Sequence, residues 1–226
     1  MDEEAVTDVR RRLREHPSAI LLVCQVGAVL FYPFLNDAPV GRTILGVVSM
    51  LVVGLALWAV RRTPALNVVA FSLGLPALVL TVLETVSARD DTVVLISSLL
   101  HAPFYFYVAV GLIRYLFHDT HVTADEFYAV GAAFTVVAWG YCYIFQAVEV
   151  VWPGSFSGLD ASADPQTWFN LLFLSFTTLT NTGLSDIVPA LAHARSVVML
   201  EQFTGVMYLG LLLARIIAMA SERRNR

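Results

Sequence analysis

The sequence contains no lysine, so all 14 of its positively charged residues are arginines. Charged residues of both signs make up only 14% of the 226 residues, whereas a soluble domain carries about 25%. With a mean hydropathy of +0.71, this scarcity of charge excludes an ordinary soluble domain and indicates a chain surrounded by lipid. The formal net charge of −4 is too small to indicate nucleic acid or another highly charged partner.

Cysteine is nearly absent as well. Cys24 and Cys142 both lie inside apolar stretches, which excludes a disulfide framework and favours small buried side chains. His118 and His121 have no cysteine or carboxylate pattern around them that is typical of a metal site. We therefore expect no cofactor. Polar residues within the apolar stretches are mostly hydroxyls, without the histidines or paired acids of an intramembrane enzyme.

Six apolar runs follow one another along the chain. Each has, or nearly has, the roughly 20 residues that a helix needs to cross a hydrocarbon core about 30 Å thick. A helix is the only open-ended conformation that satisfies its own backbone in lipid, so the sequence predicts an all-α membrane protein with six transmembrane helices. The predicted spans are 19–35, 43–60, 65–86, 92–117, 124–151 and 196–219.

Arginine is distributed unevenly between the two ends of these predicted helices. One side of the membrane receives Arg42, Arg89 and Arg195. The other side receives Arg10, Arg11, Arg12, Arg14, Arg61, Arg62, Arg114, Arg223, Arg224 and Arg226. Because cytoplasmic segments are the richer in basic residues, both termini are predicted to be cytoplasmic, as an even number of crossings also requires. We expect a multi-pass protein of the inner, or plasma, membrane.

The longest connection, 152–195, contains a short apolar segment, 166–179, that cannot span the membrane. Asp164 and Pro165 before it predict a helix N-cap and a first-turn proline. A half-length helix followed by polar chain at membrane depth indicates a re-entrant loop, which is tolerated only where protein or water surrounds it. The partly negative C-terminal end of that helix would then point toward the membrane centre and favour a cation.

Residues 180–185, Thr-Asn-Thr-Gly-Leu-Ser, follow this short helix and are called the polar loop below. Their side-chain oxygens, together with those of Thr177 and Thr178 and with backbone carbonyls, are the groups that a dehydrating cation needs. One chain has one such loop and cannot enclose a pore. Several chains around an axis can, because their loops then form rings of oxygens.

The sequence SFTTLTNTGLSDIVP, Ser175 to Pro189, resembles the pore loop of the potassium-channel superfamily, which reads roughly S-F-x-T-x-T-T-V-G-Y-G-D-x-x-P. The stretch from Leu200 to Ala218 is similar to the inner helix of that family. The resemblance implies a homotetramer with one central pore. The matching positions are Ser175, Phe176, Thr178, Thr180, Gly183, Asp186 and Pro189.

The resemblance also implies roles for individual residues. Gly205 would be the gating hinge of the inner helix. Filter support and the outer mouth would be formed by Thr178, Trp168, Asp186 and Glu201. The selectivity filter would hold potassium at Thr180, Asn181, Thr182, Gly183 and Leu184, and would end with Ser185.

Three residues of the polar loop depart from the family pattern. Asn181 replaces the threonine of the innermost ion ring, and Leu184 replaces a tyrosine whose hydroxyl braces the filter. Ser185 replaces a glycine that typically has a positive φ, which costs roughly 1 kcal/mol or more in a residue with a β-carbon. Potassium conduction, a mixed potassium and sodium current, and a collapsed, non-conducting filter therefore stay open as alternatives.

The chain is predicted to divide into an interfacial segment, 1–18, a four-helix module, 19–122, a pore domain, 123–219, and a short cytoplasmic tail, 220–226. The four-helix module stands where a voltage sensor would stand. Its fourth predicted helix has only one arginine, Arg114, at the cytoplasmic end. Since a voltage sensor needs several basic residues within the membrane field, this module cannot be a conventional one.

These observations predict the pore-forming subunit of a homotetrameric cation channel without a voltage sensor, passing potassium and having no enzymatic activity. A non-conducting regulatory subunit on a channel scaffold is the alternative. A transporter is a further one, although transporters often have broken helices in both halves, and only one half here has a re-entrant segment. The expected partners are copies of the chain itself and membrane lipids, with no soluble partner. The all-arginine, alanine- and valine-rich composition is typical of a bacterial chain.

Overall fold

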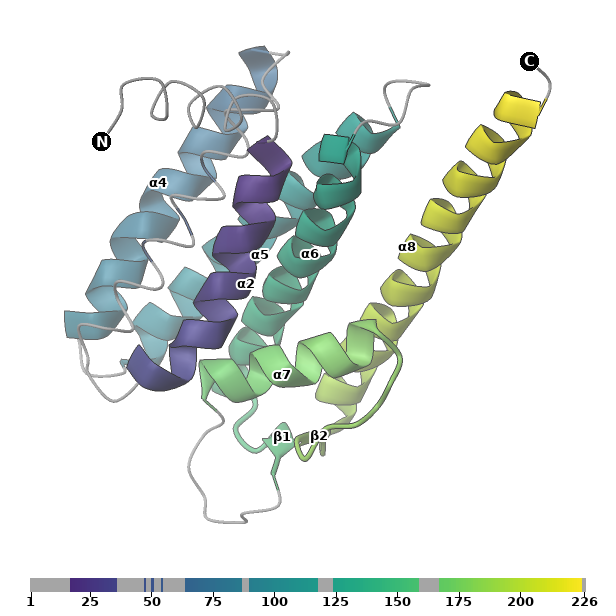
Figure 1. Ribbon diagram of the computed structural model, residues 1–226. Coiled ribbons are helices and arrows are strands. Elements are labelled where there is room, and N and C mark those ends of the chain that lie inside the picture. Colours follow the sequence, from purple (N-terminus) through teal and green to yellow (C-terminus); the bar gives the residue numbers. More distant parts are fainter. Residues whose placement is uncertain are drawn as a thin grey trace. The chain divides into compact units, whose positions relative to one another are not determined.

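The computed structural model describes residues 17–35, 47, 50, 54, 64–86, 90–117, 124–158 and 167–224. Within these residues nearly all of the regular structure is helical (Figure 1). The helices are α2 (Pro17–Leu35), α4 (Pro64–Val86), α5 (Asp91–Leu116), α6 (Ala124–Val151), α7 (Trp168–Leu179) and α8 (Ala192–Arg224). Two short strands, β1 (Phe156–Ser157) and β2 (Val188–Pro189), form the one sheet of the described chain.

The described helices confirm the all-α prediction and coincide with five of the six predicted apolar runs. α5, α6 and α8 are long and apolar enough to cross a membrane, so the chain is a membrane protein. The predicted run 43–60 lies almost wholly outside the described residues, as does most of the segment 1–18. The count of six crossings and the four predicted domains therefore stay predictions.

Local sequence explains how these helices begin and continue. α5 starts after Asp90, whose side chain accepts a hydrogen bond from the backbone N–H of Thr92 at 2.9 Å and caps the helix. Pro33, Pro76 and Pro103 lie inside α2, α4 and α5 without ending them. Membrane helices tolerate such prolines because neighbouring groups bond to the freed carbonyls.

The chain divides into two compact units, Met1–Val137 and Ala138–Arg226, and the long helix α6 contributes to both. In the first unit, Asp125 of α6 accepts hydrogen bonds from the backbone N–H and the hydroxyl of Ser18 in α2, at 2.9 and 2.8 Å. It also accepts one from the hydroxyl of Tyr115 in α5 at 3.2 Å. One carboxylate therefore joins the ends of three helices.

Polar side chains of the first unit bond to one another between α4 and α5. The buried His101 of α5 has its ring nitrogens 2.8 Å from the carbonyl oxygen of Ser97 and 3.1 Å from the hydroxyl of Thr81 in α4. Nearby, Gly74 of α4 allows close packing, since a β-carbon there would lie 2.8 Å from the ring of Phe104. His101 is a packed, hydrogen-bonded residue of a helix interface.

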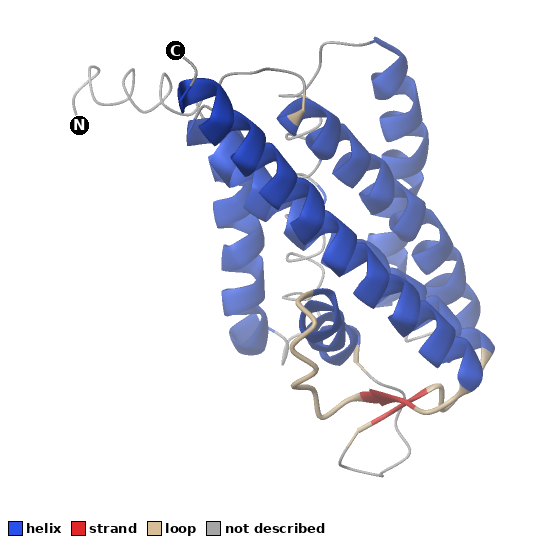
Figure 2. Cartoon of the chain, turned by 90° about the vertical axis from the view of Figure 1, so that its right-hand side faces the viewer, coloured by secondary structure: helices blue, strands red, loops and turns tan. Residues whose placement is uncertain are grey.

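The second unit contains the end of α6, the short helix α7 and the long helix α8, with α7 lying crosswise to α8 (Figure 1). Strand β1 pairs antiparallel with β2, placing Phe156 opposite Pro189. Figure 2 shows the loop that leaves α7, drawn in tan, running to this strand pair. The polar loop is thereby held at both ends, by a helix before it and by a strand after it.

The connection from α6 into β1, residues 152–158, is called the α6–β1 loop. Glu149 in the last turn of α6 accepts hydrogen bonds from the backbone N–H groups of Gly154 and Phe156, at 2.9 and 3.0 Å. The carbonyl of Ser155 in turn accepts a hydrogen bond from the N–H of Ala190 at 2.8 Å, just before α8 begins. These bonds fix the α6–β1 loop to both long helices of the second unit.

Candidate functional site

Helix α7 leads directly into the polar loop and determines where it begins. Its N-cap is Thr167, whose hydroxyl accepts a hydrogen bond from the backbone N–H of Asn170 at 3.3 Å. The N-cap predicted at Asp164 is therefore wrong, and Asp164 itself lies outside the described residues. The predicted half-length helix is confirmed, because α7 has 12 residues and cannot cross a membrane.

The C-terminal end of α7 closes in a Schellman motif. The N–H of Asn181 bonds to the carbonyl of Thr178 at 2.9 Å, and the N–H of Thr182 bonds to that of Thr177 at 3.0 Å. Asn181 has a φ of 57°, the left-handed conformation that this motif requires one residue past the helix cap. Asparagine adopts that conformation more readily than most residues do. The rule for ending a helix thus explains the asparagine at this position.

Backbone donors of the polar loop point back to α7, whereas its backbone acceptors do not. The N–H groups of residues 180–183 all donate to carbonyls near the end of α7, at 2.9 to 3.2 Å. Within the described part of the chain, no hydrogen bond reaches the carbonyl oxygens of residues 180–185. Oxygens that have no donor of their own are available to coordinate a cation.

The side-chain hydroxyls of the polar loop are partly engaged within the chain. Thr180 donates its hydroxyl hydrogen to the carbonyl of Phe176 at 2.7 Å, and Thr182 donates to that of Thr177 at 3.2 Å. The hydroxyl oxygen of Ser185 accepts a hydrogen bond from the N–H of Ile187 at 3.1 Å. The backbone carbonyls are therefore the better candidate ion ligands, and the two threonine hydroxyls retain lone pairs beside them.

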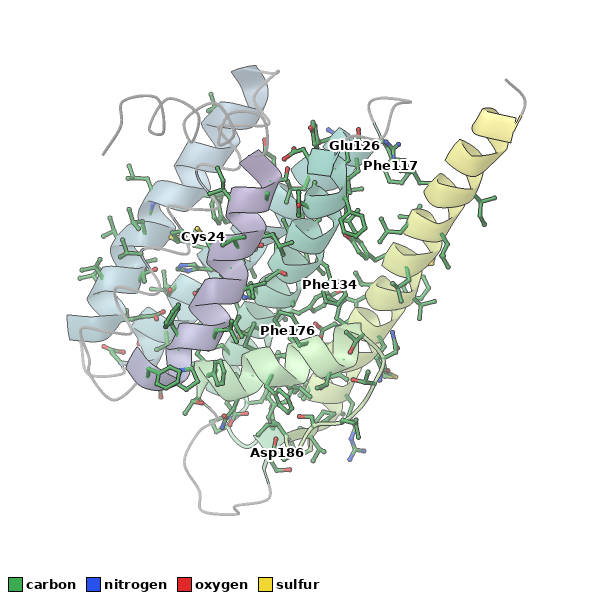
Figure 3. The ribbon with its side chains drawn as sticks, viewed as in Figure 1. Cys24, Phe117, Glu126, Phe134, Phe176 and Asp186 are labelled. Carbon is green, nitrogen blue, oxygen red and sulfur yellow. The ribbon has the colours of Figure 1, made fainter. Side chains whose placement is uncertain are left out.

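In a single chain the polar loop is exposed rather than enclosed. Residues 180–184 are all exposed, and Leu184 has 78% of its surface accessible. Asp186 is also exposed and lies beside the two short strands, at the end of the second unit opposite the end of α8 (Figure 3). The polar groups of this loop are therefore accessible in a single chain.

The structure corrects the expectation of strain at Ser185. The positive φ values among the described residues belong to Asn181, Gly183 and Gly154, and Ser185 is not one of them. Left-handed positions of the polar loop therefore fall at asparagine and glycine, the residues that adopt them at the lowest cost. The serine does not disfavour the conformation of the loop.

Two contacts, one helical turn apart, join α7 to α8. The buried side chains of Ser175 and Glu201 are hydrogen-bonded. Four residues further along each helix, the carbonyl oxygen of Leu179 packs against Gly205, where a β-carbon would overlap it. Since Thr180 directly follows Leu179, these contacts determine where the polar loop begins. The predicted role of Gly205 as a gating hinge stays a prediction; the structure shows a close backbone approach there.

Helix α6 supports α7 from another side. The hydroxyl oxygen of Ser175 lies 2.7 Å from the carbonyl of Ala138. Trp168, the first residue of α7, packs its ring 6.4 Å from that of Trp139 and 6.1 Å from that of Tyr143, centre to centre. Trp168 therefore supports the end of α7 opposite the polar loop. The other predicted support residue, Thr178, is buried and supplies the carbonyl that caps Asn181.

Sequence reasoning missed two features of this site. The first is the helix-ending role of Asn181, for which a signal existed, since asparagine just past a helix end is typical of a Schellman motif. The second is the bond between Ser175 and Glu201, which are 26 residues apart. No local pattern indicates that pair, because it depends on how α7 packs on α8.

The described residues contain no cluster of three His, Cys, Asp or Glu side chains able to hold a metal ion. Comparison with known proteins is more specific. A family described as "Ion channel" matches residues 131–222, which include α7, the polar loop and most of α8. No curated protein and no solved structure matches the chain significantly. The matched family consists of channels, which confirms the prediction that the chain is not an enzyme.

Proposed function

The chain is a member of the potassium-channel superfamily, with its ion-channel domain at residues 131–222, and we propose that it is the pore-forming subunit of a homotetrameric cation channel without a voltage sensor. Four polar loops would meet on a shared axis and carry ions in single file. The proposed permeant ion is potassium, held at residues 180–184, with selectivity against sodium relaxed by the altered NTGLS sequence at 181–185.

One observation carries this proposal: the N–H groups of residues 180–183 are hydrogen-bonded to α7, whereas the carbonyl oxygens of residues 180–185 accept no hydrogen bond within the described part of the chain. A cation that leaves water must receive oxygens in place of its hydration shell. Carbonyl oxygens already bonded to protein donors serve this purpose poorly. Those of residues 180–185 have no such donors, whereas the N–H groups of residues 180–183, which would repel a cation, are directed away into α7.

Assembly around an axis is supported by what one chain leaves exposed. The described residues of the single chain leave the polar loop exposed, and a ring of copies would cover it. α8 also exposes large apolar side chains on several faces, more than one neighbouring helix would cover. These are Met199, Leu200, Phe203, Val206, Met207, Leu209, Leu211, Leu213 and Ile217. In the proposed tetramer, other copies cover the faces nearest the axis and lipid covers the rest.

The absence of a voltage sensor is proposed from the described helices of the first unit. α5 contains one arginine, Arg114, in its last turn, and α4 contains no basic residue. One charge moving through the whole field gains about 2.3 kcal/mol per 100 mV, which is too little for steep voltage dependence. We predict a shallow conductance–voltage relation in planar bilayers. A gating charge of several units per subunit would contradict this part of the proposal.

The proposed orientation places both termini in the cytoplasm and the polar loop on the outer side of the inner membrane. It depends on the excess of arginine at one end of the predicted helices. Asp186, which is exposed at the end of the polar loop, would then attract cations to the outer mouth.

The decisive test measures potassium and sodium flux separately in liposomes that contain the purified protein, with Leu184→Arg as the variant. Leu184 is exposed, so the substitution leaves the single chain folded but brings four guanidinium groups to the axis, where they repel cations. We expect flux to fall at least about tenfold, which corresponds to 1.4 kcal/mol. Val188→Arg, at a position with 51% of its surface exposed in β2, is the matched control and should retain flux.

Each outcome of this test bears on a separate part of the proposal. A tetramer in which Leu184→Arg conducts like the unaltered protein contradicts the assignment of the pore. An intact tetramer that passes neither cation indicates a non-conducting regulatory subunit instead. Equal potassium and sodium flux retains the pore but removes the potassium preference. A particle without four subunits contradicts the proposed assembly.

A further inference from the structure

Glu201 is buried in α8, and no positive side chain among the described residues of the second unit bonds to it. None of its surface is accessible (0%), and its carboxyl group contacts Ser175 of α7. α6 and α7, the other helices of the second unit, contain no lysine, arginine or histidine. The nearest arginines of α8 in sequence, Arg195 and Arg215, lie about 9 and 21 Å away along the helix axis. A carboxylate buried in this way would be strongly destabilised.

Counting hydrogens shows which form of Glu201 the geometry requires. The hydroxyl of Ser175 has one hydrogen and two neighbours, the carboxyl oxygen of Glu201 and, at 2.7 Å, the carbonyl oxygen of Ala138. A carbonyl can only accept, so the hydrogen of Ser175 must point to Ala138 for that contact to be attractive. The remaining contact then needs a hydrogen from Glu201. Only the protonated acid has one to give.

The second carboxyl oxygen of Glu201 supports the same assignment. Oε2 is buried and has no hydrogen-bond partner among the residues that the structure describes. In a carboxylate this oxygen would carry half of a negative charge with nothing to stabilise it. In a neutral acid it is an ordinary carbonyl oxygen, whose burial without a partner costs far less.

We propose that Glu201 is a neutral carboxylic acid that donates its proton to Ser175, while Ser175 donates its own to the Ala138 carbonyl. This hydrogen-bonded chain runs in one direction from α8 through α7 to α6. It fixes α7 one turn before the contact between Leu179 and Gly205, and hence one turn before the polar loop. Glu201 is a positioning residue, and its effect on ions rests on the proposed function, whereas its protonation does not.

Infrared spectroscopy of the full-length protein at neutral pH tests the protonation directly. The difference spectrum between unaltered protein and Glu201→Gln should contain the carbonyl stretching band of a protonated acid, which no carboxylate shows. Glu149→Gln is the matched control, because Glu149 accepts two backbone N–H bonds as a carboxylate does. Its difference spectrum should lack the band of a protonated acid. Carboxylate bands in the Glu201→Gln spectrum would overturn the proposal, whether or not the protein conducts.

The infrared spectrum of Ser175→Ala provides a second test, in which Glu201 itself is unchanged. Removing the hydroxyl deprives the acid proton of its acceptor, so the acid band should move to higher frequency, as expected for a weaker hydrogen bond. An unchanged band position would contradict the bond from Glu201 to Ser175. This variant also replaces the first test if Glu201→Gln does not assemble.

Flux measurements connect the hydrogen-bonded chain to the polar loop. Glu201→Gln keeps a donor of similar size for Ser175, so its ratio of potassium to sodium flux should stay within about twofold of the unaltered protein, as a replaced bond costs little. Glu201→Leu removes the donor, and its ratio should change by more than about fivefold, the effect of 1 kcal/mol. Equal losses in both variants would mean that a negative charge is required, which would overturn the proposal.

Discussion

The second unit contains two short loops that share a positive-φ glycine and differ in whether their carbonyl oxygens accept hydrogen bonds. Each has an exposed glycine with a positive φ, 79° at Gly154 in the α6–β1 loop and 66° at Gly183 in the polar loop. In the α6–β1 loop both kinds of backbone group are used, since Glu149 binds its N–H groups and Ala190 donates to its Ser155 carbonyl. In the polar loop the N–H groups of residues 180–183 are used, whereas the carbonyls of residues 180–185 accept no hydrogen bond in the described part of the chain. Exposure and glycine content alone therefore do not distinguish the α6–β1 loop from the loop that we propose binds ions.

The helix end that each loop meets accounts for the difference. A helix begins with unpaired N–H groups and ends with unpaired carbonyls. The α6–β1 loop meets the two residues just before α8, Ala190 and Leu191, whose N–H groups bond to its Ser155 carbonyl at 2.8 and 3.4 Å. The polar loop meets the end of α7, so the carbonyls of α7 take its donors. In the proposed pore, the C-terminus of α7 would point at the ion path, so α7 would supply a favourable dipole and also leave the carbonyls that follow it without donors.

The largest effect is expected from a substitution that shifts the end of α7, where the polar loop begins. Gly205→Ala is that substitution. A β-carbon at Gly205 would overlap the Leu179 carbonyl, which is backbone and cannot rotate away. Overpacking of this kind costs about 1–3 kcal/mol and shifts the backbone around it. We expect the variant to lose cation flux, measured in liposomes, and to have a lower melting temperature than the unaltered protein, measured in detergent.

Gly210→Ala, five residues further along α8, is the matched control. A β-carbon there meets nothing within 4 Å. Alanine in place of a helical glycine favours the helix by about 0.5–1 kcal/mol, so flux should persist and the melting temperature should rise slightly. If Gly205→Ala and Gly210→Ala behaved alike, the close approach of α7 and α8 would not be what positions the polar loop.

The sequence predicted the helices and the location of the polar loop, for physical reasons that act locally. An apolar run of sufficient length must be helical in lipid, which located α5, α6 and α8. An apolar segment too short to cross, followed by hydroxyls, located α7 and the loop after it. Both inferences depend on residues that are neighbours in the chain.

Features that depend on packing between distant segments could not be predicted in this way. Ser175 and Gly205 were both recognised as matching positions of a family, yet their contacts follow from the angle at which α7 crosses α8. The conformation of the polar loop was misjudged at Ser185, because the family pattern places a glycine there. The actual left-handed residue, Asn181, follows from how α7 ends.

The smallest effects are expected from alanine substitutions at the positive-φ glycine of each loop, Gly183 and Gly154. No atom lies within 4 Å of a β-carbon at either Gly183 or Gly154, so both substitutions cost only the strain of a left-handed alanine, about 1 kcal/mol. We expect equal, small decreases in melting temperature. Only Gly183→Ala should alter the ratio of potassium to sodium flux, because relieving its strain would rotate carbonyls that face the ions in the proposed pore.

The flux comparison depends on the two variants being destabilised by the same amount. With strain matched, a selectivity change confined to Gly183→Ala must come from the direction of carbonyl groups and not from general loosening of the second unit. A change of similar size in Gly154→Ala would show that any strained loop in this unit disturbs conduction. The absence of hydrogen bonds to the carbonyls of residues 180–185 would then no longer support the proposal that these residues line the ion path.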